Sequence, residues 1–425
     1  MRVAGAAELK PLLAPAAIIA AAALALWAGP TLPASLSGLK EYGPYFVLLA
    51  SAGVAMWFNR GRALVAALSL FLAYAGYRYS LGYGEASFTA RAVYAAVAVL
   101  VPANVLVALL LPERGVKYHG DYRWLLIALA EVLLVAWIAS SGRSALSGTA
   151  WQDILDHWLF FKGRAAQGGL PPLPILGRIL FSAALIAAFW RAWPRKTDRF
   201  APLDIGLAGA LIAFYVACER AGDPAVFGVF TSAAGAVLVV AMLQESYRLA
   251  FHDELTGLPG RRALQEAMAS LGPRYVIAMG DVDHFKSFND THGHDIGDQV
   301  LKLVAARLAE VEGGGRAFRY GGEEFTVLFP EASLGEAQPY LEAIRAAVEA
   351  YRMAVRGEDR PKDKEAGEKR RVGEDSMPPE KLLSVTISIG CAEPSDRART
   401  PAQVLKAADE ALYRAKRGGR NRVSR

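Results

Sequence analysis

The stretch that decides how the C-terminal part of this chain folds is Tyr275-Val-Ile-Ala-Met-Gly-Asp-Val-Asp283. Its apolar run predicts a buried β-strand over residues 275–282, because a short apolar segment bounded by a turn signal is typical of such a strand. Side chains alternate between the two faces of a strand, so Asp281 and Asp283 lie on one face and Val282 on the other. The strand therefore ends in two carboxylates on the same side of a sheet.

The same part of the chain contains further strand-like runs at 316–320, 324–329 and 383–392, and helical patterns at 296–312, 334–353 and 401–417. The resulting order β-α-β-β-α-β-α predicts an α/β (α+β) domain. Its sheet is antiparallel or mixed with helices on one face, as in ferredoxin-like and polymerase-palm folds. Residues 354–382 mix both signs of charge and contain few apolar residues, which predicts a solvated loop.

A second acidic element lies at the central hairpin, Gly321-Gly-Glu-Glu-Phe325. Glycines permit a tight turn and leave room for a ligand against the backbone. If the hairpin neighbours the first strand, Asp281 and Glu323 converge, and carboxylates with backbone carbonyls suit Mg²⁺. Taken singly, each element is more often an acidic strand end or an ordinary turn.

Three further groups suit a nucleotide. Lys286 follows the first strand, where backbone N–H groups and an ammonium would hold phosphates. Asn289 and Asp298 offer the amide and carboxylate that match the Watson–Crick edge of guanine. Lys416 and Arg420 follow an amphipathic helix and would clamp a triphosphate, although a basic last turn is also ordinary helix chemistry.

The N-terminal part has a different composition. Residues 1–248 contain 20 Lys and Arg and 13 Asp and Glu, whereas residues 249–425 contain 27 and 28. The net charge of +6 therefore comes from the first part. A nucleic-acid-binding protein would carry its basic excess on the soluble part instead. We therefore expect no nucleic acid partner. The two cysteines, Cys218 and Cys391, fall one in each part, so no disulfide framework is implied.

Apolar runs recur through the first part at 11–29, 45–58, 63–77, 92–111, 124–140, 175–193, 205–218 and 226–243. A helix needs roughly 20 residues to cross a bilayer. We therefore expect residues 1–243 to form an all-α polytopic bundle of about eight transmembrane helices in contact with the lipid bilayer. Reading the first run as a signal peptide would leave seven spans.

The distribution of Lys and Arg predicts the orientation. The N-terminus and every second segment between the apolar runs are denser in Lys and Arg than the segments on the opposite side. Positively charged loops stay in the cytoplasm, so these segments are predicted to be cytoplasmic. The chain is then a multi-pass protein of the inner (cytoplasmic) membrane. Residues 244–252 continue the last span as a connecting signalling helix, and residues 253–425 form a cytoplasmic domain. Glu131 lies inside the fifth run, where an ionisable group is either functional or held by a partner.

Five motifs follow one another in the soluble part. They are Asp253-Glu-Leu-Thr-Gly-Leu-Pro259, Asp281-Val-Asp-His-Phe-Lys286 with Asn289–Asp298, Arg319-Tyr-Gly-Gly-Glu-Glu-Phe325, Val385-Thr-Ile-Ser-Ile-Gly390, and Ala408–Lys416 with Gly419-Arg-Asn421. Together they resemble the GGDEF-domain diguanylate cyclases over residues 253–425. The resemblance implies that two GTP are condensed to cyclic di-GMP and two pyrophosphates, in a homodimer formed through the cytoplasmic domain.

The resemblance also implies roles for single residues. Asp281, the carbonyl of Val282 and Glu323 would hold Mg²⁺, with Mn²⁺ as an alternative and Glu324 as a further ligand. Glu323 would also be catalytic, by favouring deprotonation of the attacking hydroxyl. The substrate-binding residues it implies are Asn289 and Asp298 for guanine, Phe285, Lys286, Lys416 and Arg420 for the phosphates, and His294 in the same pocket.

The chain departs from the family pattern at two places. Glu312-Gly-Gly-Gly315 stands where many members carry an Arg-x-x-Asp product-inhibition motif, so we expect no inhibitory site there. Gly260 stands where Asn is usual. The sequence thus favours a membrane-bound diguanylate cyclase whose spans sense an unidentified ligand or set the dimer geometry. The alternatives are a catalytically silent GTP-binding receptor domain and a transporter with a regulatory appendage.

Overall fold

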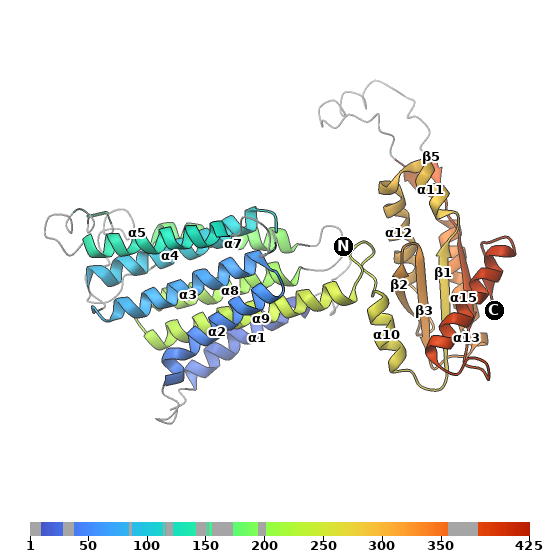
Figure 1. Ribbon diagram of the computed structural model, residues 1–425, viewed down its shortest axis with the longest axis horizontal. Coiled ribbons are helices and arrows are strands. Elements are labelled where there is room, and N and C mark those ends of the chain that lie inside the picture. Colours follow the sequence, from blue (N-terminus) through green and yellow to red (C-terminus); the bar gives the residue numbers. More distant parts are fainter. Residues whose placement is uncertain are drawn as a thin grey trace, which may run out of the picture. The chain divides into compact units, whose positions relative to one another are not determined.

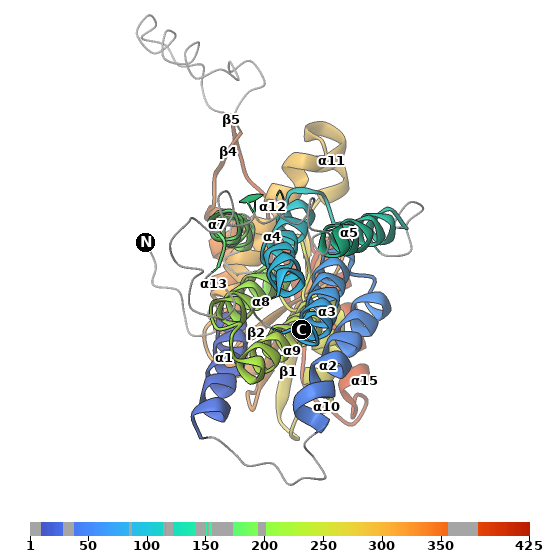
Figure 2. The same ribbon diagram turned by 90° about the vertical axis from the view of Figure 1, so that its left-hand side faces the viewer.

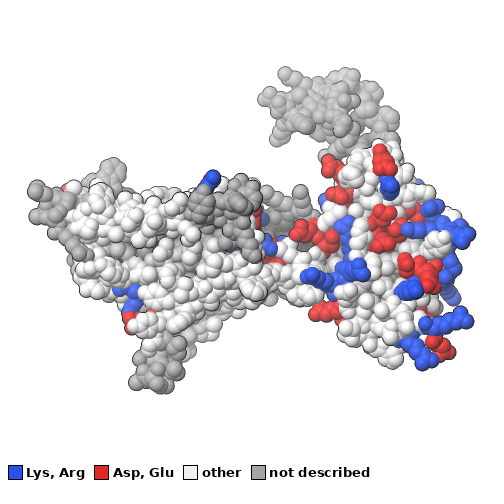
Figure 3. All heavy atoms as spheres, in the orientation of Figure 1, with Lys and Arg blue, Asp and Glu red and all other residues white. Residues whose placement is uncertain are grey.

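The computed structural model describes residues 10–28, 38–84, 87–113, 115, 122–141, 150, 153–154, 173–193, 201–355 and 381–425. The chain divides into two compact units, Met1–Tyr247 and Arg248–Arg425. Charged side chains cover the visible surface of the second unit, whereas that of the first is mostly uncharged (Figure 3). The surfaces therefore follow the division in composition along the sequence.

The first unit is a bundle of helices, and each apolar run of the sequence lies in one of them (Figure 1). The helices are α1 (Lys10–Trp27), α2 (Gly38–Trp57), α3 (Gly61–Leu81), α4 (Phe88–Leu110), α5 (Tyr122–Ser141), α7 (Ile175–Ala192), α8 (Pro202–Glu219) and α9 (Pro224–Phe251). Among the described residues, α3, α4, α5, α7, α8 and α9 are long and apolar enough to cross a membrane. The described part of the membrane region thus has six candidate spans, where the sequence predicted about eight crossings.

Small and aromatic residues hold this bundle together. The aromatic rings of Tyr77 and Phe227 stack at 3.8 Å between centroids, and the Tyr77 hydroxyl donates to the carbonyl of Ala221. Helices α8 and α9 approach so closely at Gly206 that a Cβ there would overlap the side chain of Ala241. Small residues let helix backbones meet in this way, which is how membrane helices gain packing contacts.

Helix α5 lies at the edge of the bundle, as the view along the helices shows (Figure 2), and most of its side chains are exposed. A polar contact joins it to its neighbours. The amide of Asn104 on α4 donates to Glu131 Oε2 at 3.0 Å and to Ser69 Oγ on α3 at 3.2 Å. Of the two readings of Glu131, the structure supports the one in which a partner holds the carboxylate.

An ionic cluster joins the ends of four helices. Arg62, almost fully buried at the start of α3, lies 3.2 Å from the carboxylate of Glu113 and donates to the carbonyl of Leu111 beyond α4. Asp204 at the start of α8 lies 3.8 Å from Arg62 and 3.7 Å from Arg191 on α7. Buried charges need such partners, because an unpaired one is costly.

The second unit contains a five-stranded sheet of order β2-β3-β1-β6-β7. Its strands are β1 (Tyr275–Val282), β2 (Arg316–Gly321), β3 (Glu324–Pro330), β6 (Ile387–Ala392) and β7 (Val423–Ser424). All neighbours are antiparallel except β6 and β7. The strand predicted over 383–392 is wrong in its extent, since that segment divides into β5 (Lys381–Leu383) and β6. Strand β5 pairs instead with β4 (Met353–Val355), and the loop predicted between them lies largely outside the described residues.

Helices cover both faces of this sheet, which corrects the expectation of a single covered face. Helices α12 (His294–Ala309) and α13 (Leu334–Ala350) pack against one face, and α10 (Arg261–Ala269) and α15 (Pro401–Arg417) against the other. All eight residues of β1 are buried, as a strand covered on both faces must be. The short polar helix α11 (Phe285–His292) follows β1 and was not among the helices that the sequence predicted.

Candidate functional site

The acidic residues of β1 and of the β2–β3 hairpin lie side by side, as the sequence predicted. Asp281 is the register partner of Glu324, and the backbone N–H of Val282 donates to the carbonyl of Glu323 at 3.3 Å. Asp281 is 5% exposed, and the Nζ of Lys416 lies 2.9 Å from its Oδ1. Three acidic residues and one lysine thus lie near the end of β1.

The electrostatics of this group come from burial and mutual repulsion. Burial raises the pKa of Asp281, although Lys416 acts in the opposite direction. Burial also raises the pKa values of Glu323 and Glu324, and the nearby charge of Asp281 raises both further. A cation bound here would offset the repulsion among these ionised carboxylates and would lower their pKa values.

The donor set of this group fits a hard divalent cation. Mg²⁺ takes oxygen ligands and is usually bound by one or two carboxylates together with substrate phosphates. Within the described residues, no group of three His, Cys, Asp or Glu side chains is arranged so that it could hold a metal ion. The carboxylates of Asp281, Glu323 and Glu324 have the right chemistry for Mg²⁺, but one or two of them would need further oxygen ligands such as phosphate.

Arg319 fixes the hairpin that carries the two glutamates. Its guanidinium donates to the carbonyl of Gly322 at 2.7 Å and to Asp253 Oδ1 at 2.6 Å. Gly322 has a φ of +52°, a left-handed conformation that glycine adopts without strain. Burial alone would raise the pKa of Asp253, but the hydrogen bonds from Thr256 and Arg319 outweigh it and lower that pKa. The motifs contained both Asp253 and Arg319, but only the fold shows that they meet.

The residues expected to read guanine lie on α11 and α12. The Oδ1 of Asn289 is buried and accepts no hydrogen bond. It lies so close to Gly297 that a Cβ there would overlap it, and Asp298, which follows Gly297, is exposed. A buried polar atom without a partner calls for a ligand or water. The structure thus brings Asn289 next to the residue that precedes Asp298.

The remaining predicted residues lie on α11, on α12 and in the turn after α15. Phe285 is buried at the start of α11 with its ring against Gly297, and Lys286 beside it is exposed. His294 is exposed at the first position of α12. Arg420 is exposed in the turn after α15, with a φ of +60°.

Strand alternation placed Asp283 on the same face as Asp281, and its charge helps to raise the pKa of Asp281, but the carboxylate of Asp283 has hydrogen-bond partners of its own. Asp283 follows the last residue of β1, and its carboxylate accepts hydrogen bonds from the hydroxyls of Thr386 and Ser388 and from the backbone N–H of Asn421. These donors lie more than one hundred residues further along the chain, so no local sequence signal could identify them.

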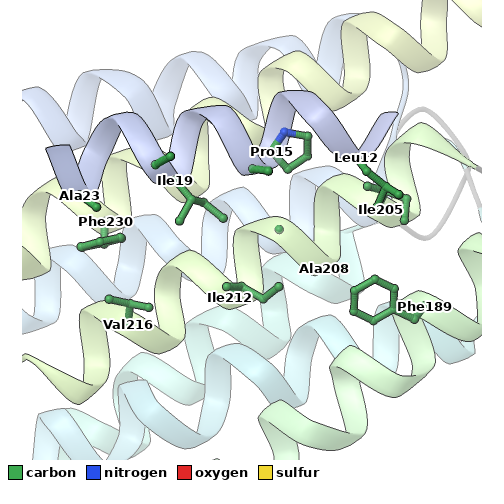
Figure 4. A pocket seen from close by; sticks show the side chains of 13 residues that line it. Leu12, Pro15, Ile19, Ala23, Phe189, Ile205, Ala208, Ile212, Val216 and Phe230 are labelled. Carbon is green, nitrogen blue, oxygen red and sulfur yellow. The ribbon is translucent and has the colours of Figure 1, made fainter. Parts of the chain in front are cut away.

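A separate cavity of about 590 Å³ lies in the first unit. Figure 4 shows Pro15 and Ile19 of α1, Ile212 of α8 and Phe230 of α9 around it. Its lining is almost wholly apolar, which suits hydrocarbon and supplies no group for chemistry. This cavity therefore offers no candidate catalytic residue.

A mixed sheet covered by helices on both faces places the second unit in the class of α/β domains. Residues 250–367 and 372–422 match the family described as "Diguanylate cyclase, GGDEF domain". The C-terminal part of this chain is therefore a GGDEF domain.

Curated relatives share this part of the chain. The response regulator PleD of Caulobacter vibrioides is 38% identical over 190 residues, which are 43% of this chain and 37% of that protein. The diguanylate cyclase DgcP of Pseudomonas aeruginosa is 36% identical over 189 residues, or 43% of this chain and 25% of that protein. The diguanylate cyclase VdcA of Vibrio cholerae is 36% identical over 178 residues, or 41% and 46%. The chain thus spans less than half the length of each of these relatives.

Among solved structures, the coiled coil and GGDEF domain of DgcB from Caulobacter crescentus, in complex with c-di-GMP, is 34% identical. It is matched over 43% of this chain and 88% of that chain, with a TM-score of 0.35. The diguanylate cyclase SiaD from Pseudomonas aeruginosa, in complex with its activator SiaC, is 36% identical over 43% of this chain and 64% of that chain, with a TM-score of 0.34.

Proposed function

We propose that this protein is a membrane-bound diguanylate cyclase that condenses two GTP to cyclic di-GMP and two pyrophosphates. The observation that carries the proposal is the register of Asp281 opposite Glu324, with the ammonium of Lys416 at 2.9 Å from Asp281. Phosphoryl transfer needs charge neutralisation and positioning more than covalent chemistry from the protein. An acidic group beside a lysine supplies both.

In this proposal, Asp281, the carbonyl of Val282 and Glu323 hold Mg²⁺ or Mn²⁺, with Glu324 as a further ligand. The ion, when bound, neutralises phosphate charge and lowers the pKa of a hydroxyl next to it. Glu323 favours loss of the proton from the attacking 3′-hydroxyl.

The substrate residues act on the two ends of GTP. Asn289 and Asp298 read the guanine edge, and the unpartnered Oδ1 of Asn289 supports that role. Lys416 and Arg420 hold phosphates from the end of α15, and Lys286 does so from α11. Phe285 and His294 complete the same pocket.

The reaction requires a second copy of the chain, because each domain brings one GTP and the two nucleotides attack each other. We therefore propose a homodimer through the cytoplasmic domain, residues 253–425, regulated by the membrane region, residues 1–243. The uninterrupted helix α9, which runs from Pro224 to Phe251, supports a connecting role for residues 244–252. The Lys and Arg distribution supports a multi-pass location in the inner membrane with the domain in the cytoplasm.

The test is product analysis of the full-length protein in membranes supplied with GTP and Mg²⁺. The wild type should form cyclic di-GMP and pyrophosphate. Glu323→Gln should reduce turnover by at least about a hundredfold, because the neutral amide neither holds the ion nor accepts the proton. Glu312→Gln, in the turn after α12, is the matched control and should leave turnover unchanged.

Two results would contradict the proposal. Normal turnover in the Glu323→Gln protein, with its unfolding temperature unchanged, would remove the metal site assigned to the hairpin. Retention of GTP by the wild type without any product would favour the alternative, a silent GTP-binding receptor.

A further inference from the structure

Asp283 joins the end of β1 to the C-terminal turn of the chain. Its side chain is buried, with 6% of the residue exposed. Oδ1 accepts from the hydroxyl of Ser388 at 2.6 Å, and Oδ2 accepts from the hydroxyl of Thr386 at 2.7 Å and from the backbone N–H of Asn421 at 3.1 Å. Hydrogen bonds to an ionised acceptor are among the strong ones in proteins. The bonds from Ser388 and Thr386 hold the carboxylate against the sheet, and the bond from Asn421 holds the turn that follows α15.

The turn held by Asp283 has an unusual backbone. Arg420 and Asn421 have φ values of +60° and +45°, so two successive residues other than glycine are left-handed. Such a conformation persists only where its surroundings determine it. The side chain of Asn421 is also held, because it accepts from Arg345 at 2.7 Å and donates to Glu349 at 2.8 Å. The turn is therefore fixed from two sides.

This turn carries Arg420, one of the two cations assigned to the triphosphate, and it follows helix α15, which carries the other, Lys416. Arg420 precedes Asn421 directly, and its backbone N–H donates to the carbonyl of Ala415 at the end of α15. The neighbouring Lys416 contacts Asp281, the residue that lies two positions before Asp283. A carboxylate that served only the sheet would need its bonds to Thr386 and Ser388 alone. The third bond, from the backbone N–H of Asn421, fixes the turn with Arg420 relative to the end of β1.

We propose that Asp283 is a positioning residue for the binding of the triphosphate. It holds the backbone of Asn421 and thereby sets where Arg420 meets the phosphates. This inference rests on the proposed function, since it takes GTP as the ligand. It assigns Asp283 no contact with the nucleotide or the ion.

The test compares two ligands that share guanine and differ in phosphate. Full-length protein in detergent with Mg²⁺ is titrated with a GTP analogue that has a non-hydrolysable α–β bridge, and separately with GMP. In Asp283→Asn, the amide retains one acceptor oxygen for three donors, so the turn loosens while the sheet contact persists. The analogue should bind about tenfold more weakly, and GMP should bind as it does to the wild type.

Two further variants separate positioning from a general loss of structure. Ser388→Ala removes one bond to the sheet and keeps the bond to Asn421, so the ratio of the two affinities should stay at the wild-type value. Asn421→Gly tolerates the positive φ and keeps the N–H, but loses the contacts with Arg345 and Glu349. It should weaken binding of the analogue selectively, in the same direction as Asp283→Asn.

The outcomes are distinct. An unchanged affinity ratio in Asp283→Asn, or an equal loss for both ligands, would overturn the inference. If Asp283→Asn does not fold, a wild-type ratio in Asn421→Gly overturns it. Selective binding by a wild type that forms no cyclic di-GMP would remove the proposed function and leave the role of Asp283 intact.

Discussion

At the scale of single residues, Lys416 decides how the acidic group behaves. Its ammonium lies 2.9 Å from Asp281 and opposes the rise in the pKa of that carboxyl caused by burial. A carboxyl whose folded pKa is raised stabilises the fold below its unfolded pKa, and this contribution is lost as pH rises through the folded pKa. The group therefore disfavours the fold at neutral pH, which a bound cation would offset.

We expect the pH dependence of metal binding to reveal this contact. Mn²⁺ binding requires ionised carboxylates, and the pKa values of Asp281, Glu323 and Glu324 are all raised. Binding should therefore be lost, on acidification, at a higher pH than the ordinary carboxylate pKa of about 4. Lys416→Met should move the loss to higher pH still, because the opposing cation is gone. Electron paramagnetic resonance of Mn²⁺ over a pH titration measures the pH at which half of the binding is lost. An equal midpoint in the Lys416→Met protein and the wild type would contradict the assigned contact.

At the scale of elements, the close contact of α15 with β6 sets the site. At Gly390 of β6, a Cβ would overlap the backbone of Ala408 and Leu412 on α15. Helix α15 begins at a capping box formed by Thr400 and Gln403 and ends beside the acidic group with Lys416. The glycine of the motif over 385–390 is thus a packing requirement that also determines where Lys416 lies.

Replacing Gly390 by Ala should push α15 away from the sheet. Overpacking a rigid contact between two backbones costs about 3 kcal/mol, so the unfolding temperature of the second unit should fall by several degrees. Binding of the GTP analogue should weaken as well, because Lys416 moves with the helix. Calorimetry on the full-length protein measures the first effect, and Gly335→Ala, where a Cβ meets no atom within 4 Å, is the control.

The elements that the sequence predicted well were those with a continuous apolar pattern. The bounds of β1 and α15 were confirmed, and all eight apolar runs of the first part are helices. The prediction that helices cover only one face of the sheet was wrong, because the apolar run of a strand does not tell which helices pack against that strand. Helix α11 is short and polar, and α10 has only Leu264 buried, so neither has a strong periodic signal. The acidic group was predictable because its residues adjoin strand ends, whereas the partners of Asp283 depend on tertiary contacts.

At the scale of the whole molecule, the proposed reaction depends on two copies of the chain. Each active half would supply one nucleotide, so turnover should follow the concentration of dimers. We expect the rate of cyclic di-GMP formation to rise more steeply than linearly with protein density in reconstituted vesicles, until dimers predominate. The rate can be measured while the protein density in the vesicles is lowered by adding lipid, with the total amount of protein held constant. A strictly proportional rate at every density would show either a permanent dimer or a reaction within one chain, and cross-linking would distinguish them.

Strands β4 and β5 pair with Val355 opposite Lys381, so these two residues are neighbours in the second unit. The length of whatever connects two adjacent points makes little difference to the domain that holds them, because closing a longer loop costs only a logarithmic increase in entropy. This hairpin is therefore a natural place to splice in a fluorescent reporter. A label there would follow the protein in living cells while both termini stay native.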